Sequence, residues 1–341
     1  MKRILLIYTG GTIGMIKNPE TGALHPIDFE NLRSHIAELQ EFSHEIESYQ
    51  FDPPIDSSDM RPELWAQLVD IIVDRCHEFD GFVILHGTDT MAYTASALSF
   101  MLLGLGKPVV LTGSQLPIGM LRTDGKENLI NAIEFAAAVT TDGHPMVPEV
   151  SVCFGQHLYR GNRVTKSSAD NFNAFTSYNF PPLATVGVNI TYEQPCILRH
   201  AEGQPFDPCT RLDNSVIALT LFPGIKPQII EHVFAIPDIR GIVLRTFGSG
   251  NAPRQQWLTD ALSAATKEGK VVVNITQCDA GSVEMGLYET GNQLLQAGVV
   301  SGGDMTIECA VTKLMYLFGQ GLPAADIRTL MCRSIAGEIT E

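Results

Sequence analysis

The chain has 341 residues, of which 45% are hydrophobic and 18% are charged. A chain of this length can form two domains with sizeable cores, and its composition is typical of a globular protein. The formal net charge is −15, whereas nucleic acids and anionic membrane surfaces are bound by basic patches. The composition therefore argues against nucleic acid and membrane as partners.

No apolar segment approaches the length of about 18 residues that a membrane-spanning helix needs. A short apolar run follows the basic start and ends at glycines, so we interpret it as a first strand rather than a secretion signal. The seven cysteines are scattered without a C-x-x-C pair, which favours free thiols in the cytoplasm. The nine histidines are equally dispersed, so we expect no metal site and no cofactor.

Short β-rich apolar runs alternate with helical patterns along the chain. The runs predict strands at Arg3–Thr9, Gly81–His86, Pro108–Thr112, Glu149–Phe154, Ser215–Phe222, Gly241–Thr246 and Val271–Thr276. The helical patterns lie at Arg61–Phe79, Thr90–Leu105, Glu127–Ala138 and Thr306–Phe318. Several strands lack polar alternation, as expected for strands that are buried on both faces of a parallel sheet.

This alternation predicts an α/β protein with two open, doubly wound domains and right-handed crossovers. Residues 186–214 break the pattern with several prolines and no clear period, and we interpret them as a linker. We therefore expect a larger N-terminal domain at residues 1–185 and a smaller C-terminal α/β domain at residues 215–341.

Three loops share one pattern, in which a buried strand ends at glycine and a small hydroxyl residue follows. Their sequences are Tyr8-Thr-Gly-Gly-Thr-Ile-Gly14, Leu85-His-Gly-Thr-Asp-Thr-Met91 and Leu111-Thr-Gly-Ser-Gln-Leu-Pro117. In open α/β sheets, ligands bind outside the carboxyl ends of the strands. The side chains expected to line one crevice there are Thr12, Thr88, Asp89 and Ser114.

A phosphate-binding turn is one alternative for the first loop. Its glycines are adjacent, unlike those of G-x-G-x-x-G, and it lacks the lysine of a Walker A loop. No acidic residue ends a second strand about 20 residues further on, where Pro26–Arg33 is expected to enter a helix. The other alternative is a tight turn whose glycines only permit close packing. The recurrence of hydroxyl residues in three loops disfavours that interpretation.

The first two loops resemble the two signature segments of the bacterial-type L-asparaginase family. Further similar blocks occur in the expected order at Asp56–Met60, Thr112–Ser114, Tyr159–Lys166 and Gly248–Pro253. The segment Thr276–Gly286 resembles that of the cytoplasmic type I enzymes. The resemblance spans essentially the whole chain. It implies hydrolysis of L-asparagine to L-aspartate and ammonia by a homo-oligomer, a dimer or tetramer, without a metal or cofactor.

The resemblance also implies roles for individual residues. Thr12 is the acyl-forming nucleophile, and Thr88, Asp89 and Lys166 form a second triad. The implied substrate-binding residues are Asp56, Ser57 and Ser58 at the α-carboxylate and amino end, Asp89 at the α-ammonium, the Ser114 carbonyl at the leaving amide, and Asn251 near a site shared between subunits.

These residue types match what amide hydrolysis needs, namely a nucleophile, a proton acceptor and oxyanion donors. A lysine beside an aspartate can relay the threonine proton, and the backbone N–H groups of the first two loops can serve as oxyanion donors. Taken singly, the same residues have structural explanations. Thr88 and Asp89 are good helix caps, Lys166 resembles a surface lysine, and Asp56–Asp59 resembles a turn.

The chain departs from the family in one respect. Members often carry a tyrosine that activates the first threonine in the mobile loop after the first motif. The loop Met15–Pro26 contains no tyrosine here. His25 is a candidate for that position, and the base that serves Thr12 is left open.

A second set of residues follows strands of the C-terminal domain. Arg245 ends one expected strand, and Thr276, Gln277 and Cys278 lie at the end of the next. An arginine there can bind an α-carboxylate through two hydrogen bonds. Some type I members respond cooperatively to asparagine at a second site built from matching positions, which include Thr165. We interpret these residues as a candidate allosteric site; the alternative is a structural ion pair at Arg245 and an inert buried thiol at Cys278.

Three other functions are considered beside hydrolysis of free asparagine. An ammonia-generating amidotransferase subunit shares these motifs but is expected to carry an additional N-terminal domain. A non-catalytic regulator that binds an amino acid or nucleotide would bind its ligand and release no ammonia. The unrelated asparaginase fold with an N-terminal threonine requires self-cleavage, and the strand before Thr12 argues against it.

Overall fold

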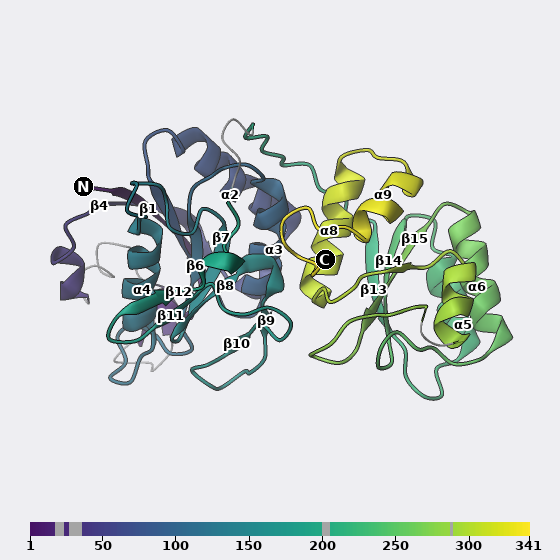
Figure 1. The fold of residues 1–341 in the computed structure, drawn as a ribbon. Coiled ribbons are helices and arrows are strands. Elements are labelled where there is room, and N and C mark those ends of the chain that lie inside the picture. The colour runs from purple at the N-terminus through teal and green to yellow at the C-terminus, as the bar shows by residue number, and fades with distance from the viewer. Residues whose placement is uncertain (18–23, 27–35, 200–204, 287–288) are drawn as a thin grey trace. The chain divides into compact units, whose positions relative to one another are not determined.

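The computed structural model describes residues 1–17, 24–26, 36–199, 205–286 and 289–341. It divides into two compact units, Met1–Thr210 and Arg211–Glu341, which Figure 1 colours purple to teal and green to yellow. Each unit is a sheet with helices on both faces. Among the described residues, every helix is too short or too polar to cross a membrane.

The first unit contains an eight-stranded sheet in the order β12-β11-β8-β7-β6-β5-β1-β4. Its parallel strands are β1 (Arg3–Gly10), β4 (Glu45–Ile55), β5 (Gly81–Leu85), β6 (Val109–Thr112) and β7 (Val150–Phe154). The antiparallel extension consists of β8 (His157–Arg160), β11 (Ala184–Val186) and β12 (Ile190–Tyr192). The strands predicted in this part of the chain are confirmed within two residues at each end.

The order of the parallel strands reverses beside β1. The chain places β4 on one side of β1, then returns to place β5, β6 and β7 in succession on the other side. Ligands of open α/β sheets bind in the crevice at such a topological switch point, outside the carboxyl ends of the strands. The loops that follow β1 and β5 therefore flank this point, and they contain the first two sequence motifs.

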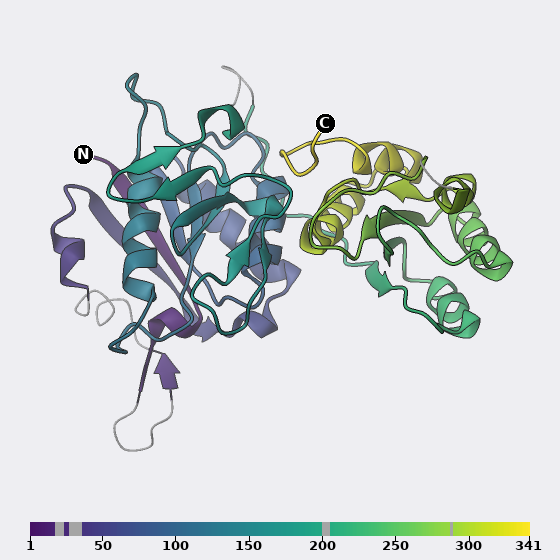
Figure 2. The ribbon, with the colours of Figure 1, turned by 60° about the horizontal axis from the view of Figure 1, so that its bottom comes forward.

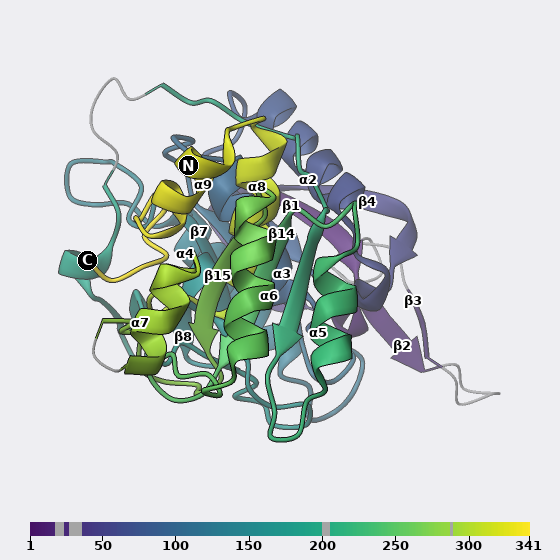
Figure 3. The same cartoon turned by 90° about the vertical axis from the view of Figure 1, so that its right-hand side faces the viewer.

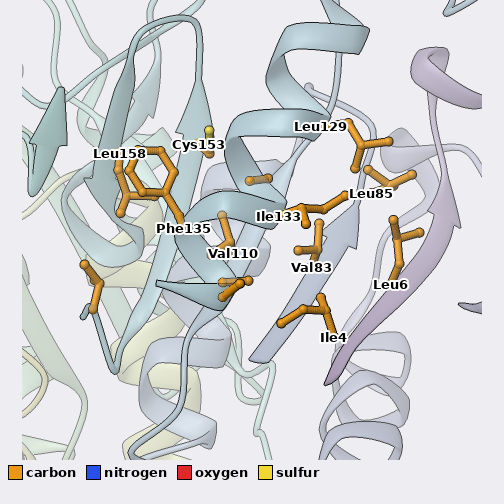
Figure 4. Close-up of a cluster of buried hydrophobic side chains, with 14 of the residues drawn as sticks. Ile4, Leu6, Val83, Leu85, Val110, Leu129, Ile133, Phe135, Cys153 and Leu158 are labelled. Atoms are coloured by element: carbon orange, nitrogen blue, oxygen red, sulfur yellow. The ribbon is translucent and has the colours of Figure 1, made fainter. Parts of the chain in front are cut away.

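Helices cover both faces of this sheet (Figures 1 and 2). On one face lies α4 (Gly125–Ala137), and on the other lie α2 (Pro62–Arg75) and α3 (Met91–Met101). Under α4 is a core of buried aliphatic side chains (Figure 4). Its members include Ile4, Leu6, Val83, Leu85, Val110, Leu129 and Ile133. As expected for a helix that is apolar nearly all round, α3 is almost completely buried.

Two features of the first unit differ from the sequence-based expectation. The edge strand β4 was not expected, because its sequence is polar and contains Pro53 and Pro54, which only an edge strand tolerates. The hairpin of β11 and β12 extends the first sheet, so the unit continues to Thr210 instead of ending at residue 185. Much of the expected linker 186–214 therefore belongs to the first unit. The helix expected to begin within Pro26–Arg33 falls largely on residues outside the described part of the chain.

The second unit contains four parallel strands in chain order, β13 (Val216–Thr220), β14 (Gly241–Thr246), β15 (Val271–Thr276) and β16 (Val300–Ser301). Figure 3 shows α5 (Pro227–Phe234), α6 (Gln256–Lys267) and α7 (Glu289–Gln296) side by side over one face. The other face is covered by α8 (Ile307–Gly319) and α9 (Ala324–Met331). Both faces are covered as expected, but the order of these described strands has no reversal and hence no switch point.

Candidate active site

Glycines bring the first two motifs into direct backbone contact at the switch point. Gly11 has a φ of +88°, and a Cβ on it would lie 2.5 Å from both Cα and N of Gly87. A Cβ on Gly10 would lie 2.2 Å from the carbonyl oxygen of Ile55, at the end of β4. Neither position accommodates a side chain without separating the loops. The glycines therefore allow the loop that carries Thr12 to lie against the loop that carries Thr88.

The third loop joins the same cluster through the segment His86–Gly87. The backbone N–H of His86 donates to the Thr112 carbonyl at 2.9 Å, and a Cβ on Gly113 would lie 2.4 Å from the His86 carbonyl oxygen. The N–H of Ile118 also donates to the Ile13 carbonyl at 3.2 Å. The three loops thus converge, as the strand-end rule predicts.

Lys166 connects two of the expected site residues. Its Nζ donates to Thr88 Oγ1 at 2.9 Å and to Asp89 Oδ1 at 2.6 Å. Thr88 is buried, the Lys166 side chain is 18% exposed, and Asp89 is 67% exposed. Thr88 therefore faces a lysine that is itself paired with a carboxylate at the mouth of the site. Such an arrangement can shift the hydroxyl proton and activate the oxygen.

Thr88 is not the cap of a helix and Lys166 is not an exposed surface lysine, although both structural roles were considered from the sequence. Thr90, not Thr88, occupies the N-cap position of α3, and the Thr88 hydroxyl contacts Lys166 instead. Lys166 lies on β9 (Thr165–Lys166), where it pairs with Phe175 of β10 (Phe175–Thr176). The Phe175 ring is buried against Phe154 at the end of β7, with 4.9 Å between ring centroids. This packing directs Lys166 to the site.

The turn Asp56–Asp59 docks on the second loop. Asp56 Oδ1 accepts hydrogen bonds from the N–H of Ser58 at 2.9 Å and from its hydroxyl at 2.8 Å. These two bonds lower the pKa of Asp56 and keep its carboxylate ionised. Ser57 is buried; its carbonyl accepts from Thr90 Oγ1 at 2.7 Å, and a Cβ on Gly87 would lie 2.4 Å from its Oγ.

Ser114 is buried and its turn is held by hydrogen bonds. Its hydroxyl donates to the Leu116 carbonyl at 2.6 Å, so this hydroxyl is not available as a nucleophile. The carboxylate of Asp124 accepts from the N–H groups of Gln115 and Leu116 at 3.0–3.1 Å. The backbone around Ser114, rather than its side chain, is the group that this turn can present to a ligand.

Gln115 lies beside Thr88 and was not singled out from the sequence. Its Oε1 lies 3.5 Å from Thr88 Oγ1, and its Nε2 donates to the Asn171 carbonyl at 3.0 Å. The available signal was its place directly after Ser114 in the third loop. An amide that both donates and accepts can link the Thr88 hydroxyl to the loop between β9 and β10.

The contacts around Thr12 do not identify the side chain that accepts its hydroxyl proton. Thr12 begins a short 3-10 turn, Thr12–Gly14, and is partly exposed. Tyr8 lies beneath this turn and donates its hydroxyl to the Gly14 carbonyl at 3.1 Å. Burial raises the pKa of Tyr8 to about 12, so its phenol is a poor proton acceptor at neutral pH. His25 lies on the short strand Leu24–Pro26, paired with Ile16.

The histidine of the second motif is unsuited to proton transfer, and the described residues offer no cluster of metal ligands. His86 is fully buried, and burial lowers its pKa to about 4, so its ring is neutral at physiological pH. The part of the chain that the structure describes contains no group of three or more His, Cys, Asp or Glu side chains arranged to bind a metal.

The remaining expected residues, apart from Thr165 on β9, belong to the second unit. Asn251 closes a tight turn after β14 by exchanging backbone hydrogen bonds with Phe247 at 2.8 and 2.9 Å. The Gln277 amide donates to the Leu221 and Arg245 carbonyls at 2.7 and 2.9 Å. These bonds connect the ends of β13, β14 and β15.

The structural alternative was an ion pair at Arg245 and a buried thiol at Cys278, and the described part of the chain shows neither. Arg245 forms no ion pair within the described residues, and its Nε is buried there without a hydrogen-bond partner. Cys278 is exposed instead of buried. Its backbone N–H donates to Thr276 Oγ1 at 2.9 Å, and that hydroxyl in turn donates to the Gly248 carbonyl at 2.6 Å.

The fold and the site together define a two-unit α/β protein of the hydrolase type, with threonines, a lysine and a carboxylate at a topological switch point. The chain belongs to the asparaginase family: the family model "Asparaginase, N-terminal" matches residues 3–198, and "Glutaminase/Asparaginase C-terminal domain" matches residues 215–331. The resemblance seen in the motifs is thereby confirmed.

Individual proteins are similar over the whole chain. L-asparaginase 1 of Escherichia coli is 44% identical, over 99% of this chain and 98% of that protein. The crystal structure of L-asparaginase I from Vibrio cholerae has a TM-score of 0.90 at 41% identity, and covers 100% of this chain and 99% of that one. The thermostable L-asparaginase from Thermococcus kodakarensis also has a TM-score of 0.90, at 36% identity, and 99% of each chain is covered.

The loop contact can be tested by a pair of glycine variants. Gly11 and Gly143 both have positive φ, at +88° and +84°, but a Cβ on Gly143 meets nothing within 4 Å. Gly143→Ala should cost about 1 kcal/mol of unfolding free energy from backbone strain alone. Gly11→Ala should cost about 3 kcal/mol or more, because the Cβ also overpacks the Gly87 backbone.

The measurement is urea unfolding followed by the fluorescence of Trp65, in a Trp257→Phe background so that only the first unit is observed. The chain has just these two tryptophans. Equal losses of stability in the two alanine variants would contradict the close contact of Gly11 with Gly87.

Proposed function

We propose that the protein hydrolyses L-asparagine to L-aspartate and ammonia with its own side chains and without a cofactor. The observation that carries the proposal is the bridge from Lys166 Nζ to Thr88 Oγ1 and Asp89, at 2.9 and 2.6 Å, beside the loop that bears Thr12. It supplies a polarised hydroxyl, a proton relay and a carboxylate at one crevice. The relatives named as asparaginases support the choice of substrate.

The reaction has two steps. In the first, Thr12 Oγ attacks the side-chain amide carbon while backbone N–H groups of the first two loops stabilise the oxyanion. The C–N bond breaks, the amide nitrogen takes up the proton that Thr12 gives up, and ammonia leaves behind an ester on Thr12. In the second step, a water molecule oriented by Thr88 and Lys166 attacks the ester carbonyl. The C–O bond breaks, Thr12 regains its proton, and L-aspartate is released.

The other polar residues of the site are suited to bind the α-ammonium and α-carboxylate groups of asparagine. An α-ammonium is attracted by the carboxylates of Asp89 and Asp56, and Asp56 stays ionised because Ser58 donates two hydrogen bonds to it. An α-carboxylate can accept hydrogen bonds from the hydroxyls of the same turn. We propose that Asp56, Ser57 and Ser58 bind this end of asparagine, while the carbonyl of Ser114 accepts from the leaving amide.

The activity test is ammonia release from L-asparagine and L-glutamine by the purified protein. Thr12→Ala, Thr88→Ala and Lys166→Met should each lower kcat by about three orders of magnitude or more, since each removes a group that acts in bond making or proton transfer. Thr191→Ala, a threonine exposed on β12, serves as the matched control and should retain full activity.

Other outcomes would point to the alternatives. Tight binding of an amino acid or nucleotide without ammonia release would favour a non-catalytic regulator. Ammonia release that depended on added tRNA and partner proteins would favour an amidotransferase component. Near-normal turnover in the Thr12 or Thr88 variant would remove that residue from the mechanism.

We further propose that the protein acts in the cytoplasm as a homo-oligomer, a dimer or tetramer, in which Asn251 of one copy lies near the site of another. Two backbone hydrogen bonds to Phe247 hold the turn that bears Asn251, which supports its use as a contact residue. Light scattering at assay concentration should show an oligomer, and a fully active monomer would contradict the proposal.

We also propose a second, regulatory site for asparagine. It is built from Arg245, Thr276, Gln277 and Cys278, with Thr165. The specific observation in its favour is that the buried Arg245 Nε lacks a partner among the described residues. A carboxylate is the natural partner of such a donor. If asparagine bound there favours an active arrangement, the rate should rise sigmoidally with substrate.

Arg245→Ala should then make the curve hyperbolic while leaving the maximal rate within about twofold, because kcat depends on the separate Thr12 chemistry. Arg254→Ala, which removes an exposed arginine of the same unit, should leave the curve sigmoidal. A hyperbolic wild-type curve over the full asparagine range would deny the site a regulatory role.

A further inference from the structure

Three buried side chains of the first unit carry hydrogen-bonding groups that take no part in the proposed reaction. They are Trp65 on α2, His86 directly after β5 and Thr94 on α3, and their exposed fractions are 5%, 0% and 0%. Trp65 Nε1 lies 2.9 Å from Thr94 Oγ1, which lies 2.9 Å from His86 Nε2. His86 Nδ1 in turn lies 2.7 Å from the carbonyl oxygen of Gly87. The chain of contacts thus ends at the backbone of the second motif.

The chemistry of the three groups fixes the direction of every bond. An indole N–H can only donate, so Thr94 Oγ1 accepts from Trp65. The Gly87 carbonyl can only accept, so His86 Nδ1 carries the proton of the neutral ring and donates it to that carbonyl. His86 Nε2 then carries no proton and accepts from the Thr94 hydroxyl. We call this chain of three hydrogen bonds the Trp65–Thr94–His86 relay.

The relay acts on a peptide unit that would otherwise be easily rotated. Glycine has the widest conformational range of any residue, and Gly87 precedes the reacting hydroxyl of Thr88. The carbonyl of Gly87 and the N–H of Thr88 belong to one planar trans peptide and point in opposite directions. Fixing the carbonyl consequently fixes the direction of the Thr88 N–H. Among the residues that the structure describes, none accepts a hydrogen bond from that N–H.

We propose that His86 is a positioning residue: through the Trp65–Thr94–His86 relay it holds the Gly87–Thr88 peptide so that the Thr88 hydroxyl meets Lys166 and the Thr88 N–H faces the substrate. The inference rests on the proposed function, which gives Thr88 its catalytic role. The relay joins both helices of one sheet face to the second motif. The packing of α2 and α3 therefore determines the geometry of the site without touching the substrate.

The relay orients groups and transfers no proton. Burial lowers the pKa of His86 to about 4, so the ring neither gains nor loses a proton at neutral pH. Its function is to orient the peptide, and it differs in this from the histidine of a serine hydrolase, which transfers the proton of the nucleophile.

The decisive experiment compares Thr94→Val with Thr94→Ser. Valine has the shape of threonine but no hydroxyl, so Trp65 and His86 Nε2 both lose their partner, whereas serine keeps the hydroxyl. Thr94→Val should lower kcat for asparagine about ten- to a hundredfold, as small misplacements of catalytic groups do, with KM changed less than about twofold. Thr94→Ser should stay within about threefold of wild type. Ser99→Ala is the control, because that α3 hydroxyl donates only to the Ala95 carbonyl.

A second pair of variants acts at the other end of the relay. In His86→Asn, the side-chain amide can still donate to the Gly87 carbonyl from near the position of Nδ1, whereas the longer chain of His86→Gln places its amide beyond that carbonyl. The proposal predicts a higher kcat for the Asn variant than for the Gln variant. Equal activity of the two would contradict the role of the Gly87 bond.

Nitrogen NMR of the protein labelled with ¹⁵N-histidine tests the relay independently of activity. The wild-type His86 ring, assigned by its loss in His86→Asn, should show a protonated Nδ1 and an unprotonated Nε2 between pH 8 and pH 6. Thr94→Val should shift the Nε2 resonance, because Nε2 loses its hydrogen-bond donor, while Nδ1 stays protonated against the Gly87 carbonyl. A ring protonated on Nε2, or a Thr94→Val enzyme with wild-type kcat, would overturn the relay. Wild-type protein that released no ammonia would overturn the proposed function and the positioning role with it, whatever the tautomer.

Discussion

The backbone contact between Gly11 and Gly87 is the constraint on which the site depends. It exists because β4 and β5 flank β1, so the loops that leave β1 and β5 diverge from one point at the edge of the sheet. Two loops can only share that point if neither carries a side chain there, since a Cβ on Gly11 would lie 2.5 Å from the Gly87 backbone. Thr12 and Thr88 each follow their glycine by one residue. The strand order thus fixes how closely two hydroxyls can approach a single substrate.

Around this contact, polar groups hold the flexible glycine loops in place. Asp124 binds the turn after β6, Asp56 binds Ser58, and His86 binds the Gly87 carbonyl. Electrostatic catalysis requires donors that are already oriented before the substrate arrives, and each of these bonds contributes to that orientation. The second unit has a different design, because its described strands run in a single direction without a switch point. Its strand ends instead carry Asn251 and Arg245, for which we propose roles in assembly and regulation.

Much of the fold and part of the site could be predicted from the sequence. Strands such as Gly81–Leu85 are uniformly apolar because both faces are buried, which makes them easy to recognise. Since the carboxyl ends of parallel strands share one edge, Thr12, Thr88 and Ser114 could be grouped without the strand order. The switch point itself could not be predicted, because β4 is a polar edge strand that contains prolines. Gln115 and the relay partners of His86 were missed because their contacts join distant segments, and local pattern carries no information about them.

In the proposed mechanism, Thr12 and Thr88 face one substrate from the two sides of the switch point. The most direct test is a crystal structure of the protein with L-aspartate, the product of the proposed reaction. The proposed mechanism predicts the side-chain carboxylate between the hydroxyls of Thr12 and Thr88, the α-carboxylate at the Ser57–Ser58 turn and the α-ammonium at Asp89. L-aspartate bound at any other place, with the crevice between the two threonines empty, would contradict it.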